Sequence, residues 1–384
     1  MRVGLIAPPW AAIPPVGYGG TEAVIDQLAR GLQHAGHEVV LYTVAESTCP
    51  VPSRHLLDAA EGMRIGACVP ELRHVLAAYD VMTDVDVIHD HTMAGPILAA
   101  IPGFTEIPVV TTNHGPFNDE LNDLYRRLNN RVDLIAISHD QASLASGVNI
   151  AKVIHHGVDP AAFPVGNGDG GHVLFLGRMA PEKGAHRAIR IARAAGKYLV
   201  IAAKMREESE RRYFETEIEP RLGDDVEYVG EVHGQHKLDL LGGAEALINP
   251  IRWHEPFGMV MIEAFACGTP VVSYPEGAAP EIVTNGIDGF LGDSDQELVD
   301  GLLSIHEIDR NACRMTVQHR FSTARMAQNH IDLYEQILDR KPRSKQITVA
   351  PTTDLVLAPE IDLTQPTPLF ETKAMVAEVT RAAM

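Results

Sequence analysis

The chain is poor in cysteine, in positive charge and in long apolar runs, and each shortage excludes a class of protein. Its four cysteines in 384 residues show no C-x-x-C spacing, so neither a disulfide framework nor a zinc site is predicted. Acidic residues outnumber basic ones by 51 to 32, which argues against nucleic acid or an anionic membrane as the main partner. No apolar run reaches the roughly 18 residues of a membrane span, and the first expected strand begins at Arg2, so a cytoplasmic protein without a signal peptide is expected.

What remains is the composition of a globular protein, with 45% hydrophobic and 22% charged residues, long enough for about two domains. Strand-like and helix-like segments alternate in two series, which predicts an α/β protein with parallel sheets covered on both faces. The expected strands are 3–7, 38–43, 85–89, 109–113, 133–138 and 152–155, then 173–177, 198–202, 226–229, 246–249, 271–273 and 289–291; helices are expected at 21–35, capped by Thr21 and closed by Gly36, and near 322–338.

A glycine-rich stretch between the two series, residues 157–171, reads as a hinge or linker. The predicted domains are therefore residues 1–160 and 161–321. The string Gly166-x-Gly168-x-x-Gly171 matches a dinucleotide fingerprint, but it precedes a strand instead of following one, which disfavours an NAD-dependent oxidoreductase. Residues 341–384, rich in Pro and Thr, are expected to be disordered or to dock on another subunit, so the protein could be a homo-oligomer.

Two glutamates are spaced to address one ligand. Glu255 precedes a helix that starts after Gly258, and Glu263 lies about two turns into that helix. The helix N-terminus offers the backbone N–H groups of Phe257, Gly258 and Met259 to a phosphate, while the two carboxylates can accept hydrogen bonds from hydroxyls on either side. A phosphate flanked by hydroxylated groups describes a sugar nucleotide. The alternative, a solvated face with two ordinary glutamates, is disfavoured because the helix is largely apolar.

The pattern Glu-Pro-Phe-Gly-x4-Glu-Ala-x-Ala-x-Gly-x-Pro-Val-Val, residues 255–272, resembles the Glu-x7-Glu motif of the retaining GT-B glycosyltransferases of the family 4 type (glycosyl transferases group 1). The resemblance implies two Rossmann-like lobes facing each other across a cleft. The N-terminal lobe would serve the acceptor, the C-terminal lobe would bind the nucleotide-sugar donor, and a final helix at about 322–340 would return to the N-terminal lobe. It also implies no metal and no cofactor.

Two basic residues complete the expected phosphate site. Arg178 follows the first strand of the second series and Lys183 begins the next helix, so both can converge where open sheets bind ligands. They match the Arg-x4-Lys motif of the same family. The alternative is a surface turn with an exposed ion pair to Glu182.

The first series contributes fewer candidates. Gly19 and Gly20 resemble the Gly-Gly motif that contacts the donor's phosphates, with a turn that needs positive φ as the alternative. His114 occupies the place of the family's His-Gly near the transferred sugar, although a buried structural histidine is also compatible. Val229 ends a strand where related proteins hold the nucleobase through backbone groups. The cluster His89-Asp90-His91 has metal-ligand composition, but the resemblance assigns no metal there.

The predicted function is transfer of a hexose, with retention, from a nucleoside diphosphate sugar of the UDP-glucose or GDP-mannose type to a hydroxyl acceptor: a sugar, a glycolipid or a small molecule. The alternatives are a GT-B-fold sugar-nucleotide epimerase and a non-catalytic sugar-nucleotide-binding protein. The sequence does not fix the nucleobase, the sugar, the acceptor or the linkage. The residues expected to act in catalysis are Arg178, Lys183, His114 and Glu255, and those expected to bind the donor are Gly19, Gly20, Phe257, Gly258, Met259, Glu263 and Val229.

Overall fold

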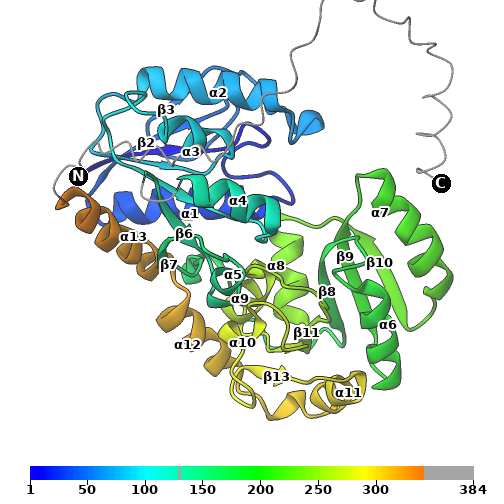
Figure 1. The fold of residues 1–384 in the computed structure, drawn as a ribbon. Helices are drawn as coiled ribbons and strands as arrows, with labels where there is room; N and C mark the ends of the chain where they lie inside the picture. Colours follow the sequence, from blue (N-terminus) through cyan, green and yellow to red (C-terminus); the bar gives the residue numbers. More distant parts are fainter. Residues whose placement is uncertain (129–130, 341–384) are drawn as a thin grey trace, which may run out of the picture. The chain divides into compact units, whose positions relative to one another are not determined.

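The computed structural model describes residues 1–128 and 131–340, and Met1–Arg340 forms one compact unit. The tail expected at residues 341–384 lies outside the described residues. The first of two sheets has seven strands, all parallel, in the order β3-β2-β1-β4-β5-β6-β7 (Figure 1). Its strands are β1 (Arg2–Ile6), β2 (Glu38–Thr43), β3 (Ser53–His55), β4 (Val87–Asp90), β5 (Val109–Thr112), β6 (Asp133–Ala136) and β7 (Ile150–Val153).

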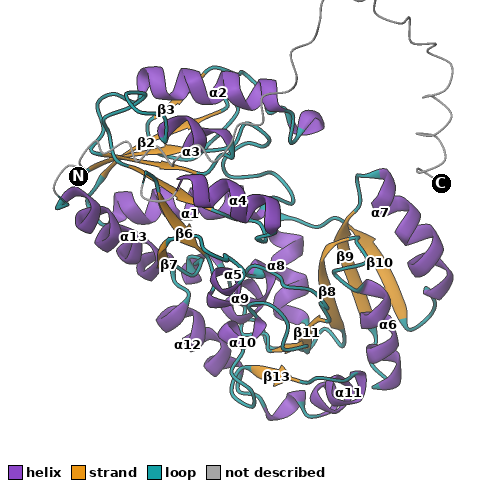
Figure 2. Ribbon diagram, in the orientation of Figure 1, coloured by secondary structure: helices purple, strands orange, loops and turns teal. Residues whose placement is uncertain are grey.

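The second sheet has six parallel strands in the order β10-β9-β8-β11-β12-β13. Figure 2 shows both sheets among their helices. The strands are β8 (Val173–Arg178), β9 (Leu199–Lys204), β10 (Val226–Gly230), β11 (Ala246–Asn249), β12 (Val271–Ser273) and β13 (Gly289–Leu291). Central strands such as β11 are buried along their whole length, as expected of parallel strands covered on both faces. The predicted fold class, two Rossmann-like lobes, is confirmed.

Helices connect the strands in each sheet. They are α1 (Gly20–His34), α2 (Cys68–Val81), α3 (Ala94–Ala99), α4 (Asp119–Leu128), α5 (His139–Ser143), α6 (Ala185–Ala194), α7 (Glu208–Tyr213), α8 (Gly234–Gly243), α9 (Met259–Ala266), α10 (Ala279–Ile282), α11 (Asp295–Leu303), α12 (Arg310–Arg320) and α13 (Thr323–Leu338). Among these described helices none is long and apolar enough to cross a membrane.

Both sheets reverse their strand order once, between β1 and β4 in the first and between β8 and β11 in the second. Open α/β sheets bind ligands outside the carboxyl ends of the strands at such a switch point. The loops that leave β1, β4, β8 and β11 are therefore where a ligand is expected. Of the predicted site residues, these loops carry Gly19, Lys183, Glu255, Phe257 and Gly258.

The last helix, α13, packs on the first sheet. Met326, Tyr334 and Ile337 from α13 are buried in one hydrophobic cluster with Val3 and Leu5 of β1. The helix lies against α1 (Figure 1), where a Cβ atom added at Gly31 would come within 2.8 Å of Ala327 Cβ. This packing agrees with the expected return of the final helix, while the domain limits at 160 and 321 stay a prediction.

Two local expectations can be compared with the structure. The N-cap predicted at Thr21 is wrong, because α1 begins at Gly20 and its N-cap is Gly19. The rejected dinucleotide string indeed runs into β8, not into a helix, and its glycines pack on the end of α8, where the Gly168 amide donates to the Gly242 carbonyl (3.1 Å). All four cysteines are free.

Candidate active site

The best-defined polar contact of the predicted site joins Lys183 to Glu255. Lys183 Nζ lies 2.5 Å from Glu255 Oε2, and the side chains are only 14% and 15% exposed. The ammonium also lies 5.3 Å from the centroid of the Trp253 ring. A mostly buried ion pair is a weak source of stability, because desolvation offsets the attraction. The pair brings two predicted residues together from segments far apart in the sequence.

Glu255 is held in place by a neighbouring glycine turn. Gly277 has a φ of +57°, and a Cβ atom there would lie 2.4 Å from the backbone nitrogen of Glu255. The amide of Ala278 donates to the Glu255 carbonyl at 3.0 Å. Only glycine at position 277 permits this approach, so the turn fixes the loop that presents the carboxylate.

Helix α9 begins beside that loop, at the predicted place. Its N-cap is Gly258 in the left-handed region, with a φ of 93°, and no side chain caps the helix. The amides of Phe257 and Gly258 donate to no partner within residues 1–128 and 131–340, and the amide of Met259, at the first helical position, has no intrahelical acceptor. Open amides at a helix N-terminus favour an anion such as phosphate. The Phe257 side chain itself is core, only 2% exposed.

Glu263 is buried on α9 and forms a second ion pair. Its Oε1 atom lies 2.7 Å from Lys237 Nζ of α8. Sequence reasoning did not name Lys237, because no motif spacing ties α8 to α9. The Glu263 carboxylate therefore already pairs with the Lys237 ammonium. The predicted contact of Glu263 with the donor stays a prediction.

Arg178 ends β8, at the carboxyl edge of the second sheet, as predicted. Its guanidinium contacts the Glu182 carboxylate, the ion pair that the sequence left open as an alternative. A second carboxylate, Glu210, lies 3.8 Å away. The Arg178 side chain is 32% exposed, so the guanidinium remains accessible to a ligand. The structure brings together Lys183, Glu255 and the start of α9, and it pairs Arg178 with Glu182, which precedes Lys183 in the chain.

The glycine loop after β1 does not have the left-handed backbone that would make glycine necessary for the turn alone. None of Gly17, Gly19 and Gly20 lies in the left-handed region, and Gly19 is extended with a φ of 179°. A Cβ atom at Gly20 would meet no atom within 4 Å, whereas one at Gly17 would lie 2.5 Å from Glu231 Oε1. Glu231 of the second lobe also accepts a hydrogen bond from the Tyr18 amide (2.8 Å). Gly20 thus leaves open space at the start of α1, where a ligand could approach the backbone.

His114, at the end of β5, is half-buried and faces other histidines. Its Nε2 atom lies 2.9 Å from His91 Nδ1, and its ring stacks on His156 at 5.4 Å. His156 in turn packs on Phe257, with ring centroids 5.0 Å apart. Burial lowers the pKa of His114 to about 3, and the nearby ring of His330 disfavours the protonated form further, so the His114 ring is neutral at physiological pH.

Val229 lies at an irregularity in β10. The pairing with β9 skips from Tyr228 to Gly230, which leaves Val229 outside the regular register. A bulge re-aims backbone groups at the end of a strand. This conformation is compatible with the predicted backbone contact to a nucleobase.

The His89-Asp90-His91 cluster has protein partners in place of a metal. The His89 ring nitrogens lie 2.7 Å from the Tyr334 hydroxyl and 2.8 Å from Thr112 Oγ1. Asp90 accepts hydrogen bonds from Thr92 and Tyr79. These bonds occupy both ring nitrogens of His89 and the Asp90 carboxylate.

Glu281, on α10, is a further polar centre outside the predicted site residues. It accepts hydrogen bonds from the amides of His139 (2.8 Å) and Asp140 (2.7 Å), and its Oε2 lies 2.8 Å from His155 Nε2. Burial alone would raise the pKa of the Glu281 carboxyl. The hydrogen bonds together lower this pKa by more than burial raises it, so the net shift is downward. In the described part of the chain, His139, His155 and Glu281 are also the one group of three such side chains whose possible metal-ligand atoms all lie within 4.8 Å of one another.

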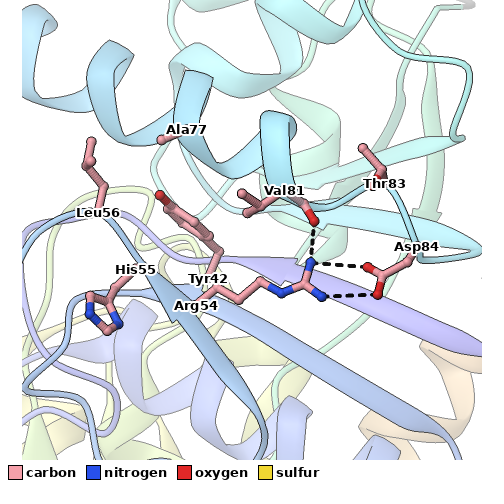
Figure 3. A pocket seen from close by; sticks show the side chains of 8 residues that line it. All are labelled: Tyr42, Arg54, His55, Leu56, Ala77, Val81, Thr83 and Asp84. Atoms are coloured by element: carbon pink, nitrogen blue, oxygen red, sulfur yellow. Dashed lines mark hydrogen bonds and ion pairs between the residues drawn. The ribbon is translucent and has the colours of Figure 1, made fainter.

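A separate hollow lies between β2, β3 and α2. Figure 3 shows this pocket, of about 480 Å³, in which Arg54 reaches the carboxylate of Asp84 at 3.0 and 3.1 Å. Tyr42 and His55 also line it. None of the predicted site residues does, and its arginine is already paired, so the pocket gives no support to a second phosphate site.

The chain matches two families in succession. The model of Glycosyltransferase Family 4 matches residues 18–162, and that of Glycosyl transferases group 1 matches residues 164–320. Glycogen synthase of Mycobacterium tuberculosis is 27% identical over 335 residues, covering 72% of this chain and 79% of that protein. Phosphatidyl-myo-inositol mannosyltransferase of Mycolicibacterium smegmatis is 26% identical over 324 residues, covering 76% and 80%. The crystal structure of AviGT4, a glycosyltransferase involved in avilamycin A biosynthesis, is 28% identical with a TM-score of 0.68, covering 88% of this chain and 98% of that chain.

The family matches follow the two lobes seen in the structure, and the Glu-x7-Glu motif lies in the lobe that the group 1 model matches. The chain belongs to the GT-B glycosyltransferases of the family 4 type, the glycosyl transferases group 1.

Proposed function

We propose that this glycosyltransferase moves a hexose from a nucleoside diphosphate sugar to a hydroxyl acceptor, with retention at the anomeric carbon and without a metal ion. The observation that carries the proposal is the Lys183–Glu255 pair beside the open amides of α9, with Nζ and Oε2 2.5 Å apart. This arrangement offers a cation and a helix N-terminus to a diphosphate, and a carboxylate to the hydroxyls of the attached sugar.

Donor binding would exchange partners within this pair. A diphosphate oxygen competes with Glu255 for the Lys183 ammonium, and its higher charge favours the exchange. Glu255, once released, accepts hydrogen bonds from sugar hydroxyls. Arg178 would turn from Glu182 to the second phosphate, because its guanidinium is 32% exposed and free to move.

In the transfer step, the bond between the anomeric carbon and the diphosphate oxygen breaks, and the acceptor oxygen bonds to that carbon. The acceptor proton passes to a donor phosphate oxygen on the same face, which gives retention and releases the nucleoside diphosphate. Arg178, Lys183 and the α9 N-terminus stabilise the charge that develops on the leaving group. His114 is a poor candidate for the base, because its pKa of about 3 makes it a weak proton acceptor.

The relatives do not agree on a sugar, since one is named a glycogen synthase and another a mannosyltransferase. We therefore propose a donor of the UDP-glucose or GDP-mannose type, and an acceptor that is a sugar, a glycolipid or a small molecule.

A thermal-shift panel tests the binding half of the proposal. UDP, GDP and ADP, and their glucose or mannose conjugates, are added to the protein in EDTA, and a ligand specific to the folded state raises the melting temperature by mass action. At a concentration of 100 times Kd the ligand adds about 2.7 kcal/mol of stability. We expect one nucleotide family to shift the melting temperature, with the shift lost in Arg178→Ala. No shift for any nucleotide would contradict the phosphate site, and a shift that requires Mg²⁺ would contradict metal independence.

A further inference from the structure

Five histidine rings form a continuous stack from α13 to the predicted sugar site. Successive ring centroids are 5.3 Å apart for His330 and His89, 4.0 Å for His89 and His91, 5.2 Å for His91 and His114, and 5.4 Å for His114 and His156. All except His114 are buried. So many buried imidazoles must be neutral, and each must therefore carry its single proton on one particular nitrogen.

Hydrogen bonds separate this stack into two parts. His89 bonds only to protein hydroxyls, those of Tyr334 and Thr112. His91 is bonded to His114, with His91 Nδ1 and His114 Nε2 2.9 Å apart. The remaining ring nitrogen of His91, Nε2, is buried and has no partner among the described residues.

The unpaired nitrogen decides which ring donates. If His114 donated to His91, the proton of His91 would sit on Nε2, as a buried N–H without an acceptor. If His91 donates from Nδ1, its Nε2 is a bare lone pair. Burying an unpaired N–H donor is the rarer and more costly state, so His91 is the donor. His114 then accepts at Nε2 and carries its own proton on Nδ1.

The Nδ1 atom of His114 is the one open end of this chain of bonds. It makes no hydrogen bond within the described residues and, unlike His91 Nε2, it is not shielded from solvent. A ligand that reaches it meets an N–H donor and needs an oxygen acceptor.

We propose that His91 is a positioning residue, which fixes His114 in the Nδ1–H tautomer so that His114 donates a hydrogen bond to an oxygen of the nucleotide sugar. This inference rests on the proposed function for the identity of the ligand, but the proton placement belongs to the free protein. The oxygen belongs to a sugar hydroxyl or to a phosphate, and the two sources can be told apart by binding.

Nitrogen NMR of the histidine rings tests the proton placement without any ligand. In ¹⁵N-histidine-labelled protein, the His114 ring of the wild type should show the Nδ1–H tautomer. His91→Phe keeps an aromatic ring but removes the donor, and it should shift His114 toward the Nε2–H form. His91→Asn places an amide N–H near the former Nδ1 and should restore the wild-type spectrum. His330→Phe, which changes the far end of the stack, is the matched control.

The proton placement is overturned if wild-type His114 carries its proton on Nε2, or if His91→Phe leaves its tautomer unchanged while the variant melts as a folded protein. It is also overturned if His330→Phe changes the tautomer as much as His91→Phe does, because packing alone would then explain the effect.

Binding and kinetics test the ligand. With the nucleotide sugar found in the thermal-shift panel, His91→Phe should lower kcat/KM about tenfold, as expected for one hydrogen bond of about 1.4 kcal/mol, and His91→Asn should recover most of it. A loss confined to the nucleotide sugar assigns the oxygen to the sugar, whereas an equal loss for the free nucleoside diphosphate assigns it to phosphate. Unchanged binding and kcat/KM in His91→Phe would overturn the positioning role. If no nucleotide sugar binds the wild type, the proposed function fails, and the NMR result still decides the tautomer.

Discussion

Replacing Lys183 by methionine is expected to slow glycosyl transfer by about a hundredfold to a thousandfold. The ammonium would hold a diphosphate oxygen whose charge grows as the glycosidic bond breaks, and removing one preorganised group of this kind typically costs 10²–10³ in kcat, or roughly 3–4 kcal/mol. The measurement is the rate of nucleoside diphosphate release at saturating donor and acceptor. Methionine keeps the length of the side chain, so its packing near Trp253 should be largely preserved.

Loss of the ion pair must be separated from loss of function, because Lys183→Met leaves the mostly buried Glu255 carboxylate without its partner. The double variant Lys183→Met with Glu255→Gln removes that isolated charge, so it should recover stability but not the rate. Lys197→Met is the matched control, since Lys197 forms a comparable pair with Glu245 (2.6 Å) outside the predicted site. Near-wild-type transfer by a folded Lys183→Met protein would refute the role of Lys183.

The second large effect is loss of stability in mild acid. Burial is the main cause of a lowered pKa in seven histidines: it lowers the pKa of His74 and His330 to about 4 and that of His114 to about 3, and it also lowers the pKa of the partly exposed His186. For the other three, His89, His91 and His156, the pKa is lowered well below the ordinary value of 6.5. These groups bind a proton in the unfolded chain below pH 6.5 but not in the folded protein. Their contribution to stability is therefore fully present above pH 6.5 and is lost as the pH falls.

Each such histidine contributes a slope of up to about 1.4 kcal/mol per pH unit below pH 6.5. Asp90 opposes the trend, because burial raises its pKa to about 6 and the folded protein takes up that proton first. The Asp90 carboxyl offsets the loss of stability from about one histidine. The raised pKa values of Glu22 and Asp288 offset less than the remaining histidines contribute. The net loss between pH 6.5 and 5 should be on the order of 5 kcal/mol.

Chemical unfolding at several pH values checks this expectation. His74→Gln is the informative variant, because glutamine can keep a donor for the Ala7 carbonyl, now 2.9 Å from His74 Nε2, while removing the titration. Its stability should depend less on pH than that of the wild type. His306→Gln, at an exposed position, should change nothing. Equal stability of the wild type at pH 6.5 and 5 would show that these histidines titrate normally.

Much of the fold could be predicted because the local residue patterns agree with the secondary structure that the segments form. The predicted strands 38–43, 246–249, 271–273 and 289–291 have the same limits in the structure, since apolar runs bounded by turn residues define them. Helix α9 ends at Ala266, and Gly268 just beyond it has a φ of 75°, the left-handed conformation that glycine commonly supplies after a helix end. Strand β3 was missed because its sequence, Ser-Arg-His, has no apolar pattern, and it is ordered only by pairing with β2 at the sheet edge.

Motif spacing identified the candidate site residues but not the contacts between them. The sequence places Lys183 at the start of one helix and Glu255 in the loop before another, but it does not reveal that their charged atoms touch. Lys237 and Glu281 were not identified as partners because they act through contacts with residues at least 26 positions away in the chain. The histidine stack was also not predictable, since its members come from four separate segments that only the folded sheet brings together.

The most direct test of the central claim is a proton NMR assay of the reaction itself. The nucleotide sugar that stabilises the protein is incubated with a panel of hydroxyl acceptors in EDTA, and the anomeric signal is followed. We predict release of the nucleoside diphosphate together with a new glycoside that keeps the anomeric configuration of the donor. An inverted product would contradict retention, an epimerised nucleotide sugar would indicate an epimerase, and binding without any turnover across the panel would contradict catalysis and favour a sugar-nucleotide-binding protein.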